Sequence, residues 1–266
     1  MFSKSLLKAT IKQNYIVFII VIGILMMYMP IIIGMYDPKT QESLNEMLEM
    51  MPKGLISAIG FSGSFTSLLG FIGGYFYGFL ILFIPMIYTI ITCNRSISSH
   101  VDKGSMAYLL STPNTRNKIA KTQAAFILVS ITLIIAFVTV VGLVLSNVQF
   151  PGELDVSRFL LLNFGVLLLY YALTGIGFFA SCLFNDTKNS LAIGAGLPVV
   201  FLLLQMISNV GEKTRFLKYF SLFTLFDPDK IIQGEGFVPS FIVLGTIAVV
   251  MYSAAIYVFK KRDLPL

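Results

Sequence analysis

The chain has 266 residues, of which 56% are hydrophobic and only 12% are charged, about half the charged fraction of a typical soluble domain. This composition excludes a soluble globular protein and indicates an integral membrane protein, since about twenty consecutive apolar residues span a bilayer as a helix. The net charge of +6 does not indicate a nucleic-acid partner, because most of the basic residues fall on one predicted side of the membrane.

Uninterrupted apolar runs predict transmembrane helices rather than the short alternating strands of a barrel. We expect one all-α domain over residues 1–266 with six spans, at residues 15–36, 68–93, 122–146, 159–184, 190–208 and 239–259. With the N-terminus inside, the cytoplasmic segments hold 12 of the 19 Lys and Arg residues and three of the 13 acidic residues. The positive-inside rule therefore predicts that both termini are cytoplasmic.

Residues 1–14 carry a row of basic side chains before the first span. Lys4, Lys8 and Lys12 follow one another at i, i+4, which favours a separate helix lying on the inner membrane surface; a merely solvated basic start is the alternative. After the first span, the pattern of Leu and Met over residues 44–51 predicts a short amphipathic helix on the outer side.

Small residues recur in two of the spans. Gly70, Gly74 and Gly78 repeat every four residues in the second span, and Gly175 and Gly177 lie in the middle of the fourth. Such residues let helices approach closely. They are candidates for a dimer interface, with ordinary packing inside the chain as the alternative.

A polar segment, residues 101–123, separates the second and third spans on the predicted cytoplasmic side. Met106, Leu109 and Leu110 fall at i, i+3, i+4 and predict a short helix with one apolar face. We expect that this domain has no room to bury that face. Thr112 is the expected N-cap of the next helix, before Pro113. The pattern favours a docking site for a soluble partner; a helix lying on lipid is the alternative.

The segment between the fifth and sixth spans is too apolar for an exposed loop and too charged for a span. Phe223 and Phe226 precede a break at Asp227 and Pro228. Irregular backbone at membrane depth survives only where protein or water covers it. We therefore expect a pair of re-entrant or interfacial half-helices on the outer side.

Catalytic chemistry is not predicted anywhere in the chain. It has no G-x-x-x-x-G-K-[ST] phosphate loop, and one His and two Cys residues offer neither a catalytic site nor a metal site. The predicted spans contain no Asp, Glu, Lys or Arg, the groups that ion-coupled carriers use at mid-membrane. If the chain is a transporter, the energy for transport therefore has to come from outside the chain.

Three stretches resemble the type-2 ABC exporter permeases. The first, Gly104 to Pro113 followed by Arg116, resembles their G-T-x-x-x-L-L-x-T-P-x-x-R loop, with Ser105 in place of Thr and Asp102 in place of the more usual Glu. The other two are residues 221–228, before the last span, and the tail, residues 259–266. The three stretches follow in the order and with the spacing of the family, and the resemblance covers essentially the whole chain.

The resemblance implies a six-span half-transporter that pairs with a second permease, often an identical chain, and with two ATPase subunits that hold the ATP and Mg²⁺. Residues 1–14 resemble the connecting helix of the family, and residues 101–118 its coupling helix. The residues that the resemblance places at the ATPase are Asp102, Gly104, Ser105, Met106, Tyr108, Leu109, Leu110 and Arg116.

The predicted spans are rich in Met, Phe and Tyr. In this they are similar to the subgroup of the family that exports phenol-soluble-modulin toxins or antimicrobial peptides. The expected cargo is an amphipathic peptide or lipid-like molecule, exported across a bacterial cell membrane. The alternatives are an ATP-independent channel or lipid scramblase and a sensory membrane subunit.

Overall fold

The computed structural model describes residues 2–37, 67–112, 114–210 and 212–263. Within these ranges every regular element is a helix. The elements are α1 (Lys4–Gly34), α4 (Leu68–Ile72), the π-helix η1 (Gly73–Leu80), α5 (Ile81–Ser96), α6 (Ser98–Asp102), α7 (Ser105–Ser111), α8 (Arg116–Gln149), α9 (Val156–Leu183), α10 (Thr187–Gly194), α11 (Gly196–Ser208), the 3₁₀-helices η2 (Glu212–Phe220) and η3 (Leu222–Leu225), α12 (Pro228–Gln233) and α13 (Val238–Lys261).

Six candidate spans lie in the described part of the chain, which confirms the predicted number and the all-α class. The second runs from Leu68 to Ser96 through α4, η1 and α5, and the fifth from Thr187 to Ser208 through α10 and α11. Each encloses its predicted apolar run to within a few residues. The helix expected at residues 44–51 lies outside the described residues.

The N-terminal basic stretch is not a separate helix. Residues 4–14 and the first span form the single helix α1, so the prediction of an independent surface helix is wrong. Lys4, Lys8 and Lys12 are exposed on its first turns. Buried side chains at Leu6, Thr10 and Asn14 explain the difference, because this face packs on the bundle.

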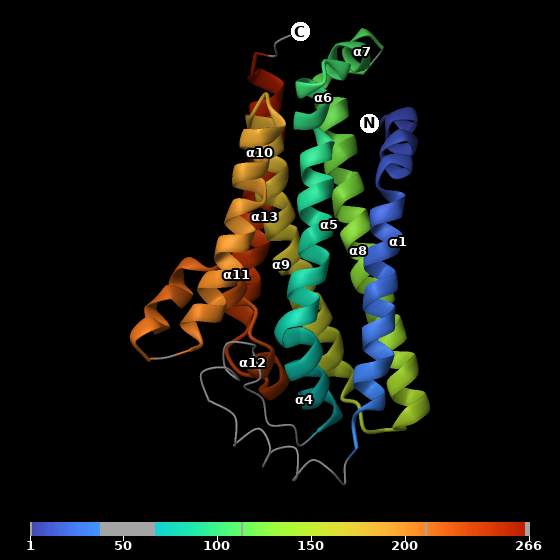
Figure 1. Cartoon of the computed structure of the whole chain (residues 1–266), viewed down its shortest axis with the longest axis vertical. Helices are drawn as coiled ribbons and strands as arrows, with labels where there is room; N and C mark the ends of the chain where they lie inside the picture. Colours follow the sequence, from blue (N-terminus) through green and yellow to red (C-terminus); the bar gives the residue numbers. More distant parts are fainter. Residues whose placement is uncertain (1, 38–66, 113, 211, 264–266) are drawn as a thin grey trace.

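Both termini and α7 lie at one end of the bundle, called here the α7 end, whereas α4 and α12 lie at the other, the α12 end (Figure 1). This arrangement confirms that the two termini share one side with the polar segment 101–123. The assignment of that side to the cytoplasm stays a prediction, based on the positive-inside rule.

Helix α9 is the centre of the bundle, in contact with α5, α8, α10 and α13 (Figure 1). A Cβ atom on Gly175 would lie 3.1 Å from Met251 Cβ on α13, and one on Gly177 would lie 3.0 Å from Cys93 Cβ on α5. These two glycines therefore permit helix packing inside the chain, which is the alternative to the predicted dimer interface. Gly70 and Gly74 are buried and Gly78 is half-buried; their role between chains stays a prediction.

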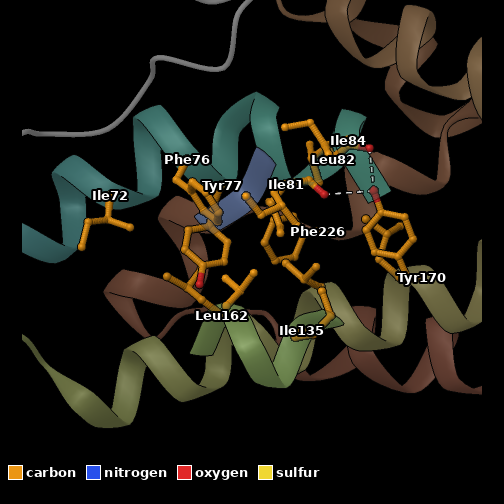
Figure 2. Close-up of a cluster of buried hydrophobic side chains, with 14 of the residues drawn as sticks. Ile72, Phe76, Tyr77, Ile81, Leu82, Ile84, Ile135, Leu162, Tyr170 and Phe226 are labelled. Atoms are coloured by element: carbon orange, nitrogen blue, oxygen red, sulfur yellow. Dashed lines mark hydrogen bonds between the residues drawn. The ribbon is translucent and has the colours of Figure 1, made fainter. Parts of the chain in front are cut away.

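The second span changes its winding twice. A π-helix occupies Gly73–Leu80, and α5 then continues through Pro85. Proline lacks the N–H that would bond the carbonyl of Ile81 four residues earlier. The Tyr170 hydroxyl of α9 contacts that oxygen at 2.9 Å and the carbonyl oxygen of Leu82 at 2.6 Å (Figure 2). A side chain from another helix thus satisfies the carbonyl that Pro85 leaves without its helical donor.

The segment between the fifth and sixth spans contains η2, η3 and α12. Phe223 and Phe226 are buried in the main core, and Tyr77 lies beside the Phe226 ring. Asp227 caps α12 by accepting a hydrogen bond from the Lys230 N–H at 3.3 Å, and Pro228 takes the first helical position. The break predicted at Asp227 and Pro228 is confirmed, while the depth of the segment in the membrane stays a prediction.

Candidate functional site

The candidate site is the coupling segment, residues 97–112, which contains α6 and α7 at the α7 end. The segment begins where α5 stops at Ser96. There the Ser181 hydroxyl of α9 accepts hydrogen bonds from the backbone N–H groups of Ile97, at 3.2 Å, and Ser98, at 2.9 Å. A break in a buried helix leaves N–H groups without acceptors, so Ser181 stabilises the turn.

Two side-chain contacts and a turn at a glycine fix the path of the segment. The Asp102 carboxylate accepts a hydrogen bond from the Thr187 hydroxyl at 2.6 Å, which joins α6 to the start of α10. Gly104, with φ at +67°, then turns the chain into α7 through a left-handed conformation that glycine tolerates best. The Ser105 hydroxyl lies 3.1 Å from His100 Nδ1. Burial and the nearby Lys103 lower the pKa of His100 below its usual value.

The predicted apolar face of α7 turns inward. Met106 has 0% exposure, and Leu109 and Leu110 are half-buried against the same cluster. The members of this cluster come from several helices of the chain: Leu6, Cys93, Ile97, Val101, Ile119, Ala120, Ala124, Ile127, Phe178, Cys182, Tyr252, Ala255 and Phe259. The expectation that this face has no room in its own domain is therefore wrong, and Met106 is not available to a partner.

The outward face of α7 carries the residues that a partner could reach. Tyr108 is 79% exposed, and Ala107, Ser111 and Thr112 are also exposed. Among the predicted docking residues, Asp102 and Gly104 are exposed as well. The accessible surface thus centres on Tyr108, a side chain with an apolar ring and a polar tip.

The next helix begins later than expected. Thr112 is the residue after α7, and its hydroxyl bonds back to the Leu109 carbonyl at 2.6 Å. The N-cap of α8 is Thr115, whose side chain accepts from the Lys118 N–H. The prediction of Thr112 as N-cap is therefore wrong. Arg116, expected at the partner surface, instead donates from Nη1 to the Arg262 carbonyl at 2.5 Å.

The start of α1 is tied to α8 by buried polar contacts. The Ser3 N–H donates to the Thr122 hydroxyl at 3.0 Å, and Gln123 Nε2 donates to the Thr10 hydroxyl at 3.1 Å. The coupling segment leads directly into α8. The coupling segment is therefore connected to α1 through α8.

Ser181→Ala is expected to loosen the coupling segment. The substitution removes the acceptor of two buried N–H groups, so we expect the free energy of unfolding to fall by about 2 kcal/mol, seen as a lower Tm in detergent. Ser146→Ala is the matched control, because Ser146 is equally buried and its hydroxyl has no hydrogen-bond partner. Equal Tm values for the two variants would contradict the role of Ser181.

Sequence reasoning missed Ser181, Thr187 and Thr115. Ser181 lies 84 positions from Ile97 and Thr187 lies 85 positions from Asp102, so no local pattern connects either pair. A small polar residue near the end of an otherwise apolar span is the only available signal. Thr115 could have been found as a second capping residue close to Arg116.

The described residues contain no group of three or more His, Cys, Asp or Glu side chains that could hold a metal ion. No curated protein matches the chain at a significant level. The sequence model of a family described as "ABC-2 family transporter protein" matches residues 7–264. Because that match covers nearly the whole chain, including all six spans and the coupling segment, the protein belongs to the ABC-2 family of transporters.

Proposed function

We propose that the chain is the membrane-spanning permease of an ATP-driven exporter, and that separate ATPase subunits dock on the outward face of α7. Family membership supports a transport role in a multi-pass membrane protein. The observation that carries the docking site is the contrast between Met106, fully buried, and Tyr108, 79% exposed, on one short helix. One side of α7 is thereby fixed in the bundle while the other is free.

This arrangement suits the transmission of force. A push on Tyr108 reaches the bundle through Met106, which packs in a cluster with Leu6 of α1 and Ile119 of α8. The Asp102–Thr187 hydrogen bond carries the same displacement to α10. ATP and Mg²⁺ belong to the ATPase in this proposal, and the permease contributes no catalytic residue.

A second permease, most simply an identical chain, and two ATPases complete the proposed transporter. The cargo is an amphipathic peptide, such as a toxin or an antimicrobial peptide, or a lipid-like molecule, moved outward across a bacterial cell membrane. Support comes from the apolar walls of the spans and from the absence of charged residues in the middle of each described span, which leaves ATP in a partner as the energy source.

Tyr108→Asp is expected to abolish ATPase binding without unfolding the permease. The test is co-expression of the tagged full chain with its partner ATPase subunit from the same organism. Co-purification then reports binding, and ATP turnover is measured in vesicles. Tyr219→Asp is the matched control, because Tyr219 is also 79% exposed but lies in η2, away from the α7 end (Figure 1).

Retention of the ATPase by Tyr108→Asp, or its loss from Tyr219→Asp instead, would overturn the proposed docking face. Transport by vesicles that hold the permease but no ATPase would overturn ATP-driven export and favour a channel or scramblase. An intact complex that hydrolyses ATP but moves no cargo would favour a sensory subunit.

A further inference from the structure

A groove of about 350 Å³ lies between α1, α5 and α8 toward the α7 end. It is within the usual size range of ligand sites. Its walls are apolar, with Leu7, Ile11, Phe18, Phe126, Val129 and Leu133 among the lining residues. Its extent along α8, from Thr122 to Leu133, corresponds to about 16 Å at the rise of an α-helix, roughly half the hydrocarbon thickness of a bilayer.

Three polar side chains at the groove are already hydrogen-bonded inside the chain. The Thr122 hydroxyl donates to the Lys118 carbonyl at 2.7 Å, the Asn14 amide donates to the Thr10 carbonyl at 3.0 Å, and the Ser130 hydroxyl donates to the Ile127 carbonyl at 2.9 Å. The Tyr88 hydroxyl, also at the groove, is buried without a hydrogen-bond partner. One hydroxyl does not replace the partners that the N–H and C=O groups of a peptide backbone would lose here, at considerable cost. An alkyl chain has no such groups and fits the wall.

The end of the groove nearest α7 is basic. Lys4 lies one turn before Leu7 on α1, and Lys118 lies one turn before Thr122 on α8, so both begin the rows of side chains that line the groove. Lys8 and Lys121 are exposed on the same turns. Neither α1 nor α8 contains an acidic residue. The mouth therefore complements an anionic headgroup.

We propose that this groove binds one acyl chain of an anionic phospholipid, with its phosphate at the lysines of α1 and α8. The lipid bridges the two helices that adjoin the coupling segment, and it is distinct from the exported cargo. The site does not depend on the proposed ATPase, since it can be measured on the permease alone. If the α7 end is cytoplasmic, as the positive-inside rule predicts, the lipid belongs to the inner leaflet. Only this placement rests on the proposed orientation.

The test is native mass spectrometry of the purified full chain in detergent, with dioleoyl phosphatidylglycerol and dioleoyl phosphatidylcholine as probes. The two lipids have the same chains and differ in headgroup charge. We expect one phosphatidylglycerol to be retained at least about tenfold more tightly than phosphatidylcholine. Lys118→Gln with Lys121→Gln is expected to remove most of this preference, because each basic residue near the surface contributes about a factor of five.

Two matched controls separate the site from general effects. Lys260→Gln with Lys261→Gln removes the same charge at the end of α13 and is expected to leave the preference unchanged. Ala125→Trp fills the groove and is expected to abolish retention of the lipid, whereas Val144→Trp, on the same helix but outside the groove, is not. The Tm of each variant reports whether it is folded.

The proposal is overturned if both lipids are retained equally, or if folded Ala125→Trp binds phosphatidylglycerol as Val144→Trp does. Displacement of the lipid by an amphipathic cationic peptide that Ala125→Trp no longer binds would reassign the groove to peptide cargo. Loss of lipid binding would leave the ATPase test at Tyr108 unaffected, so the two proposals fail independently.

Discussion

Met106→Asp is expected to unfold the α7 end of the protein. The Met106 side chain is fully buried in a cluster formed by α1, α5, α8, α9 and α13. A carboxylate at this position has no partner, and removal of the thioether leaves a cavity, so we expect a loss of roughly 4 kcal/mol or more in the free energy of unfolding. Thermal unfolding in detergent should show a Tm lower by about 10 °C.

The control for Met106→Asp is Tyr108→Asp, two residues along the same helix. Because Tyr108 is 79% exposed, the same new charge remains in water and the Tm is expected to stay within about 2 °C. A stable Met106→Asp variant that fails to bind the ATPase would contradict the burial of Met106. It would restore the original expectation that the apolar face of α7 contacts the partner.

Gly175→Val is expected to separate α9 from α13. A Cβ atom on Gly175 would lie 3.1 Å from Met251 Cβ and 3.6 Å from the Ala248 carbonyl oxygen. Both atoms are fixed to the α13 backbone, so rotation of a side chain does not relieve the contact. The two γ-methyl groups of valine add further overlap, and separation would also break the 3.0 Å hydrogen bond from Tyr252 to Thr174. We expect a loss of about 3 kcal/mol, measured by thermal unfolding.

Gly245→Val on α13 is the matched control, because a Cβ atom there meets no heavy atom within 4 Å. The change in helix propensity is the same in the two variants and therefore cancels in the comparison. If both variants unfold at the Tm of the unchanged protein, the close approach of α9 and α13 at Gly175 does not stabilise the fold.

The spans could be predicted from sequence because removal of apolar surface from water depends mainly on the composition of each run. The charge bias likewise predicted that the termini and the coupling segment share one end. The resemblance at Gly104 to Pro113 located the candidate site, while the positive φ of Gly104 was found only in the structure.

The orientation of side chains within the site could not be predicted in the same way. Met106 is buried because Leu6 and Ile119, distant in sequence, converge on it. An apolar face at i, i+3, i+4 has the same pattern whether it is covered by its own chain or by a partner. Thr112 and Thr115 are both competent caps, and only the position of α8 selects Thr115. The π-helix at Gly73–Leu80 was likewise not predicted from the periodicity of the second span.

That π-helix has a consequence for relatives of the protein. Its hydrogen bonds run from i to i+5 instead of i+4, so Gly73–Leu80 is equivalent to one residue inserted into an α-helical second span. Loss of a single residue there would rewind the span and rotate everything on one side of it by about 100°. Tyr170 would then no longer face the Ile81 carbonyl. Family members that wind this span as a plain α-helix should therefore align with a one-residue gap at this place, and the length of the span, rather than a motif, distinguishes the two forms.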